Sequence, residues 1–128
     1  MNIGEAAVHT GVPAKTIRYY EEIGLVKPPL RSANNYRHFD DTSIRTLQFL
    51  KRARSLGFTI DDCRGLLSLY QDRRRSSADV KALAERRVTQ IDKKIAELEG
   101  MRATLSHLIA QCHGDERPDC PILDDLSG

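Results

Sequence analysis

The chain has 128 residues, of which 40% are hydrophobic, 30% are charged and only 5% are aromatic, with no tryptophan. This length suits one compact domain, or a small domain with an extension, and a large aromatic core is not expected. The net charge of +2 is unevenly distributed. Residues 1–75 hold 13 Lys and Arg against 8 Asp and Glu, whereas residues 76–128 hold 7 against 10. The basic first part favours a polyanionic partner, with a chance imbalance on solvated faces as the alternative.

The sequence contains no apolar run near the roughly 18 residues of a membrane span, and its N-terminus is unlike a signal peptide. We therefore expect a cytoplasmic protein without a membrane partner. Cytoplasmic thiols stay reduced, and three cysteines are an odd number, so a disulfide framework is not expected. Instead, Cys112 and Cys120, which enclose seven polar or turn-forming residues, indicate metal binding or redox sensing.

Two short helices joined by a turn are predicted at the N-terminus. Asn2 and Glu5 have the spacing of a capping box that opens the first helix, a turn follows at residues 11–13, and the second helix covers residues 14–22. This arrangement is typical of a helix-turn-helix, in which the second helix enters the major groove of DNA, although such pairs also occur in other proteins. Ile17 is expected in the core. The candidate DNA contacts of the second helix are Lys15, Thr16, Arg18, Tyr19 and Tyr20.

Residues 25–39 change in character and predict a short β-hairpin. Asn34-Asn35 can occupy the positive-φ positions of its turn. Arg31, Tyr36 and Arg37 converge on its tip and suit a wing that lies against a phosphate backbone. A surface hairpin without a partner is the alternative.

Two further helices are predicted before residue 75. Asp40 or Asp41 can cap the first, which ends near Gly57. Arg54 lies among basic residues near its outer side and is a further candidate DNA contact. The second helix has an apolar pattern that includes Cys63, which we expect to be a small core residue rather than a metal ligand. The inner face of the first helix carries Ile44, Leu47, Leu50 and Ala53.

A long helical pattern runs from Ser76 to Gln111. Its apolar residues recur at steps of four and three, which predicts a coiled-coil seam that only Arg102 interrupts. About 30 residues at about 1.5 Å each form roughly 45 Å of helix, more than a small N-terminal domain can cover. The simplest partner is a second copy in a symmetric homodimer, and packing back on the same chain is the alternative. The seam residues are Ala84, Val88, Ile91, Ile95, Leu98, Leu105 and Ile109.

Together these motifs resemble the MerR family of transcription regulators. The similarity lies in residues 3–7, 16–25 and 31–37, although the family usually has glycine where this chain has Asn35. Cys112 and Cys120, followed by Pro-Ile-Leu, resemble its copper-efflux branch, the CueR type. The resemblance implies a mainly α fold in three parts. These are a winged helix-turn-helix DNA-binding domain with a small β-hairpin wing over residues 1–75, an antiparallel dimerisation coiled coil over residues 76–111, and a metal-binding loop with a short C-terminal helix over residues 112–128.

Two thiolates alone satisfy Cu(I), Ag(I) or Au(I), which favour soft ligands. Zn(II) needs four ligands. Similar regulators of divalent metals have a cysteine near the start of the long helix, and the corresponding residue in this chain resembles Ser77, which is a poor metal ligand. We therefore expect one Cu(I) in each two-cysteine loop, with Ag(I) and Au(I) also suited. His113 with Asp115 or Asp119 could still complete a zinc site, and a divalent-metal or thiol-redox sensor is the alternative.

Pro121 predicts a short helix over residues 121–126 with Cys120 at its N-terminus, where the helix dipole favours a thiolate. The resemblance implies an activator of copper-efflux and copper-homeostasis genes. Metal binding would distort the promoter DNA so that RNA polymerase can engage both promoter elements, which are separated by a spacer that is too long. The apo form would bind the same DNA without this distortion. The chain shows no nucleophile with a base and no phosphate-cradling glycine loop, so we do not expect an enzyme. A metal-buffering or coiled-coil scaffold protein is the alternative from another class.

Overall fold

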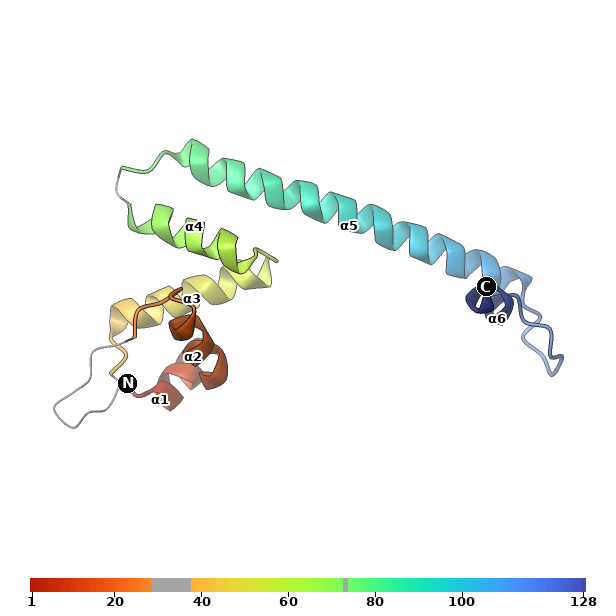
Figure 1. Ribbon diagram of the computed structural model, residues 1–128, viewed down its shortest axis with the longest axis horizontal. Coiled ribbons are helices and arrows are strands. Elements are labelled where there is room, and N and C mark those ends of the chain that lie inside the picture. The colour runs from red at the N-terminus through yellow and green to blue at the C-terminus, as the bar shows by residue number, and fades with distance from the viewer. Residues whose placement is uncertain (29–37, 73) are drawn as a thin grey trace. The chain divides into compact units, whose positions relative to one another are not determined.

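The structure, a computed structural model, describes residues 1–28, 38–72 and 74–128 (Figure 1). Over these residues the prediction of a mainly α fold is confirmed. The predicted wing residues Arg31, Tyr36 and Arg37 lie outside the described residues. The described chain forms helices α1 (Ile3–Thr10), α2 (Ala14–Glu22), α3 (Asp41–Ser55), α4 (Ile60–Gln71), α5 (Ser77–Gln111) and α6 (Pro121–Ser127).

Local capping residues determine where several helices begin. The Asn2 side chain accepts a hydrogen bond from the Glu5 amide at 2.8 Å, and the Glu5 carboxylate accepts one from the Asn2 amide at 3.3 Å. Asp40 and Thr59 likewise accept from the backbone amide three residues later, at 2.8 and 3.0 Å. Hydrogen bonding from Ser43 holds the pKa of the Asp40 carboxyl below its usual value. These bonds satisfy amides that the first turn of a helix leaves unpaired, which is why the predicted starts are confirmed.

Two compact units make up the described chain, Met1–Ala84 and Glu85–Gly128. Helix α5 runs through the boundary between them, whereas the predicted domain boundary at residue 75 lies just before this helix.

The first unit is built around one apolar core. Helix α1 packs on α2 and α3, and α3 packs on α4. The Cys63 side chain is fully buried, as predicted, and so is the predicted inner face of α3. The core consists of Ala6, Val12, Ile17, Tyr20, Leu25, Phe39, Ile44, Leu47, Leu50, Ala53, Phe58, Cys63 and Leu67.

The turn between α1 and α2 depends on Gly11. Its φ of +76° is in the left-handed region, and its amide donates to the Ala7 carbonyl at 2.9 Å. The buried Thr10 hydroxyl donates to the Ala6 carbonyl at 2.8 Å and accepts from the Val12 amide at 3.1 Å. Because these bonds satisfy the polar groups of the turn, α2 can start immediately after it at Ala14.

In the second unit, the end of α5 is joined to α6 by residues 112–120. Leu108 is buried, but the predicted seam of α5 is largely uncovered, with Val88, Ile95, Leu98, Leu105 and Ile109 between 48% and 61% exposed. Across the described chain, no helix combines the length and apolar character needed to cross a membrane.

Candidate DNA-binding surface and metal centre

Helix α2 has a buried and an exposed face. Ile17 is fully buried and anchors the helix in the core. Lys15 and Arg18 are exposed, Tyr19 is 48% exposed, and Thr16 is half-buried. Two cations and a phenol thus share one accessible surface, which is the composition that phosphate and base-edge contacts require.

Tyr20 does not belong to that surface. Its side chain is only 6% exposed, because it follows Ile17 by three residues and therefore lies on the same helical face. Burial raises the pKa of Tyr20 above its ordinary value, although the nearby Arg54 guanidinium opposes the shift. That Tyr20 contacts DNA stays a prediction, and its i,i+3 spacing from Ile17 is a sequence pattern that also indicates the core.

Arg54, at the end of α3, is exposed but already engaged. Its Nη1 atom donates to the Phe58 carbonyl at 2.7 Å, in the turn before α4. Its positive charge also opposes the burial-driven rise in the pKa of Tyr20. Arg54 thus joins the end of α3 to the α3–α4 turn, a contact that the sequence did not indicate.

The two predicted metal ligands lie at the two ends of the α5–α6 loop. Cys112 continues the last turn of α5, since its amide donates to the carbonyls of Leu108 and Ile109 at 3.1 Å each. Cys120 is the N-cap residue of α6, and its carbonyl accepts from the Asp124 amide at 3.1 Å. Both thiols are free and half-buried. Two accessible thiols joined by a short loop are candidate soft ligands for a metal ion.

The Asp115 carboxylate forms two hydrogen bonds inside the loop, both with Arg117. One carboxylate oxygen accepts from the Arg117 amide at 2.9 Å and the other from Arg117 Nε at 2.8 Å. Gly114, at φ +66°, begins this turn. His113 and Asp119 are exposed. Within the ranges that the structure describes, there is no cluster of three or more His, Cys, Asp or Glu residues that could hold a metal ion.

Ser77, predicted to lie near the metal, is the first residue of α5 and is exposed. It belongs to the first unit, whereas the cysteine loop belongs to the second.

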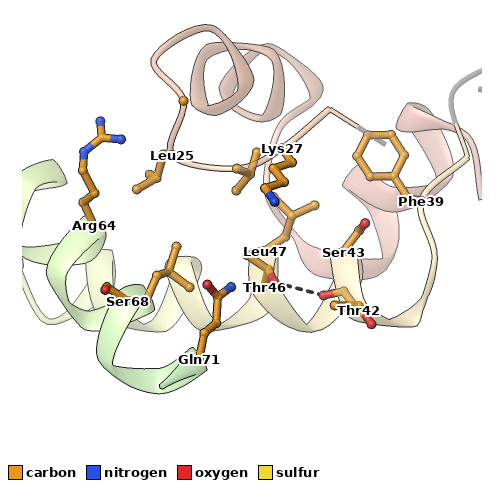
Figure 2. A pocket seen from close by; sticks show the side chains of 13 residues that line it. Leu25, Lys27, Phe39, Thr42, Ser43, Thr46, Leu47, Arg64, Ser68 and Gln71 are labelled. Atoms are coloured by element: carbon orange, nitrogen blue, oxygen red, sulfur yellow. Dashed lines mark hydrogen bonds between the residues drawn. The ribbon is translucent and has the colours of Figure 1, made fainter. Parts of the chain in front are cut away.

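Figure 2 shows a cleft of about 590 Å³ in the first unit, between the segment after α2 and helices α3 and α4. Two of its polar side chains have partners within the protein. The Thr46 hydroxyl donates to the Thr42 carbonyl at 3.0 Å, and Arg64 Nη2 donates to the Ile23 carbonyl at 3.0 Å. The predicted site residues do not line this cleft. Its Arg64 contact instead holds the C-terminal end of α2 against α4.

Two family models match the chain. The model for MerR HTH family regulatory proteins matches residues 1–69, and the MerR DNA-binding model matches residues 44–108. The chain belongs to the MerR family of transcription regulators. MerR proteins are DNA-binding regulators that act with RNA polymerase at promoters, so this protein is not an enzyme.

This MerR regulator is 54% identical over 127 residues to the HTH-type transcriptional regulator HmrR of Rhizobium leguminosarum bv. viciae, covering 99% of the chain and 98% of the relative. It is 47% identical over 128 residues to the regulator CueR of Salmonella typhimurium, covering 100% of the chain and 93% of that relative. Among solved structures, it resembles the transcription regulator PbrR691 of Ralstonia metallidurans CH34 in complex with lead(II). The TM-score is 0.84 at 31% identity, over 98% of each chain.

Proposed function

We propose that this MerR regulator is a homodimeric, copper-responsive transcription activator that senses Cu(I) through Cys112 and Cys120. The observation that carries the proposal is the pair of free, half-buried thiols at the two ends of the α5–α6 loop. Thiolates are soft ligands that favour Cu(I), and Ag(I) and Au(I) fit the same donors. The similarity to CueR and HmrR supports a metal-responsive role.

The loop disfavours additional hard ligands. Both oxygens of Asp115 accept hydrogen bonds from Arg117, so a metal ion bound to this carboxylate would lie close to the Arg117 guanidinium charge. His113, directly after Cys112, and Asp119, directly before Cys120, are the remaining candidates for a third ligand. Metal binding to the two thiols displaces their protons, so the affinity for Cu(I) is expected to rise with pH.

The first unit supplies the DNA-binding surface. Lys15, Thr16, Arg18 and Tyr19 on α2 would enter the major groove, and the predicted wing would place Arg31, Tyr36 and Arg37 against the phosphate backbone. We accordingly propose residues 1–75 as the DNA-binding domain, residues 76–111 as the dimerisation helix and residues 112–128 as the metal-binding part.

The uncovered seam of α5 supports the homodimer. Five large apolar side chains along it are about half exposed in the single chain. A second copy offers the same stripe, so an antiparallel pairing would cover both stripes at once. The dimer would then present two DNA-binding domains to two half-sites of one promoter.

Activation would work through the shape of the DNA. Metal binding would reshape the loop and α6, and the dimer would bend and untwist the promoter so that RNA polymerase engages both of its elements. Such distortion costs on the order of a few kcal/mol, which contacts to the phosphate backbone offset. Reduced thiols and promoter DNA are both found in the cytoplasm, where we place the protein.

A sensor of divalent metal ions or of thiol oxidation on the same scaffold is the second candidate. The observation that favours it is the similarity to PbrR691, whose solved structure contains lead(II). The exposed side chains of His113 and Asp119 are the groups that could extend the donor set.

Cysteine substitutions test the proposed function. We expect Cys112→Ser and Cys120→Ser each to weaken Cu(I) binding by more than about 100-fold, because each removes one of two ligands. Copper-dependent transcription should be lost while binding to promoter DNA persists. Cu(I) affinity is measured by competition with a chromophoric chelator under reducing conditions, and transcription is measured in vitro with RNA polymerase.

Cys63→Ala is the matched control, because Cys63 is fully buried in the first unit. It should leave the copper response intact and cost about 1 kcal/mol of stability. Full induction by copper in either serine variant would contradict the sensing role of the loop. Zn(II) bound more tightly than Cu(I), relative to the cellular availability of each, would favour the second candidate.

A further inference from the structure

The end of helix α2 is stabilised by a cation from another helix. The C-cap residue of α2 is Ile23, and its carbonyl accepts a hydrogen bond from Arg64 Nη2 of α4 at 3.0 Å. A Cβ at Gly24 would lie 4.0 Å from Arg64 Nη1, so both terminal nitrogens of the guanidinium lie near this turn. A cation at the C-terminal end of a helix satisfies an unpaired carbonyl and is favoured by the helix dipole. Arg64 therefore caps α2 from a distant part of the sequence.

Helix α4 holds the backbone of Arg64 in place. Cys63, the residue before it, is fully buried, and Leu67, one turn later, is 5% exposed. Arg64 and Leu67 both line the cleft that separates α4 from the segment after α2, and Figure 2 shows Arg64 extending from α4 beside Leu25. Because α4 is anchored in the core at this point, Arg64 gives the end of α2 a fixed support.

The same part of α4 also lies close to α5, the proposed dimerisation helix. A Cβ at Gly65, the residue after Arg64, would lie 4.0 Å from Leu83 Cδ1 of α5. Leu83 belongs to the first unit, so this contact joins α5 to α4 within that unit. Two adjacent residues of α4 thus contact the start of α5 and the end of α2. In the proposed dimer, the placement of each α2 helix on DNA depends on this connection.

The apolar anchors of α2 leave its tilt less well defined. Ile17 and Tyr20 are 0% and 6% exposed, and they decide which face of α2 is buried. Without the bond to the Ile23 carbonyl, α2 would be free to tilt about these two residues. A tilt of about 10° moves a side-chain tip about 10 Å from the anchors by about 2 Å, whereas hydrogen-bond lengths vary by only about 0.5 Å. A small movement at Ile23 would therefore break contacts between α2 and DNA.

We propose that Arg64 is a positioning residue for DNA binding, which caps the end of α2 from α4 and so fixes the tilt at which α2 meets the major groove. In this role Arg64 acts through α2 and does not touch the DNA. The proposal rests on the proposed use of α2 to read DNA. It makes the geometry of that surface depend on a residue outside the helix-turn-helix.

Two other roles for Arg64 lead to different results. Arg64 is exposed, which also suits a contact with a DNA phosphate. Loss of a phosphate contact lowers the salt slope, the slope of log affinity against log salt concentration, by about 0.9 for each contact and leaves α2 of the free protein unchanged. A bond that only stabilises the fold would lower the free energy of unfolding without changing the DNA affinity of the folded protein.

The experiment uses the full chain and a duplex covering the DNA upstream of its own coding sequence. Arg64→Met keeps an unbranched stem and removes every donor. Arg64→Gln, whose side chain is too short to reach Ile23, replaces it if circular dichroism shows that Arg64→Met does not fold. Arg75→Met is the matched control, because Arg75 Nη1 donates to the Asp72 carbonyl at 3.1 Å, at the end of α4 rather than of α2. It removes the same charge and the same kind of bond.

Two measurements are made on each variant. Fluorescence anisotropy gives the DNA affinity at several salt concentrations. Hydrogen exchange followed by NMR in the free protein reports on the Leu25 and Val26 amides, which donate to the Tyr20 carbonyl at 2.9 and 3.2 Å. Exchange of these amides follows local opening of the end of α2 without any DNA present.

We expect Arg64→Met to weaken DNA binding about three- to tenfold and to speed exchange of the Leu25 and Val26 amides by a similar factor. Arg18→Ala should weaken binding by a smaller factor in the Arg64→Met background than in the wild type, because a tilted α2 has already weakened the Arg18 contact. Arg75→Met should keep the affinity and the exchange rates within about twofold of the wild type.

Wild-type DNA affinity in Arg64→Met, or an equal loss in Arg75→Met, would overturn the proposal. So would a lower salt slope with unchanged amide exchange, which identifies a phosphate contact, or an Arg18→Ala effect of the same size in both backgrounds. Failure of the underlying DNA-reading role is recognised separately. Arg18→Ala would then leave binding to the duplex unchanged, while Arg64→Met would still speed exchange at the end of α2.

Discussion

Gly11 shows how a single residue can fix the helix-turn-helix. Its φ is +76°, and a Cβ at this position would collide with the side-chain amine of Lys51. The Lys51 side chain can move aside, but the left-handed backbone conformation cannot be relieved without reshaping the turn.

We expect Gly11→Ala to destabilise the protein by about 1–2 kcal/mol. Gly100→Ala is the matched control, because Gly100 lies inside α5 with open space around its Cα. That variant should stabilise the protein by about 0.5–1 kcal/mol, since alanine loses less backbone entropy in a helix. Chemical unfolding followed by circular dichroism measures both changes. A neutral or stabilising Gly11→Ala would show that the turn does not need the left-handed conformation.

Side-chain roles were predictable where helical spacing alone decides them. Ile17 and Cys63 were placed in the core from their position in an apolar repeat, and both are fully buried. Tyr20 is buried while its neighbour Tyr19 is exposed, because adjacent helical residues point about 100° apart. The contact of Arg54 with the Phe58 carbonyl depends on the conformation of the α3–α4 turn, which helical spacing does not indicate.

At the scale of elements, the helices follow from local chemistry. The predicted second helix over residues 14–22 is confirmed as α2, and the last helix, predicted over residues 121–126, is α6 (Pro121–Ser127). Caps and proline act within one turn of the chain, so the sequence contains all the information that they need. Tyr70 shows the limit of periodicity. It continues the apolar pattern of α4 but is 56% exposed, with its ring packed 4.9 Å from that of Phe49.

The seam of α5 leads to a prediction about assembly. Leu98 lies in the middle of the seam and is 52% exposed in the single chain. Leu98→Glu should weaken dimerisation by at least about 100-fold, because each copy loses a buried leucine and gains a buried charge. Lys93→Glu changes the charge of α5 outside the seam and should leave the dimer intact. Analytical ultracentrifugation measures both, and a Leu98→Glu protein that dimerises like the wild type would point to another surface.

At the scale of the whole molecule, the proposed metal-sensing loop and the proposed DNA-binding surface lie in different units. The cysteine loop belongs to the second unit, the exposed face of α2 belongs to the first, and α5 runs uninterrupted through both. The metal therefore need not create or destroy the DNA-binding surface. In the proposed mechanism it changes only the distortion that the bound dimer imposes on the promoter.

We consequently expect the apo and Cu(I)-loaded proteins to bind promoter DNA with affinities within about tenfold of each other, while their transcription differs strongly. The difference in affinity stays small because the few kcal/mol of DNA deformation are offset by backbone contacts. Gel shifts and in vitro transcription with the same duplex compare the two forms. An apo protein that fails to bind the duplex would indicate that metal controls occupancy rather than DNA shape.

The burial of Cys63 has a practical consequence. The chain has three thiols, two half-buried at the loop and one enclosed in the core of the first unit. An alkylating reagent would therefore label the protein in two stages. The fast stage counts the loop thiols that are free of metal, and the slow stage follows the rate at which the first unit opens. One unmodified sample can thus report metal occupancy and conformational opening together, with no dye attached and no residue replaced.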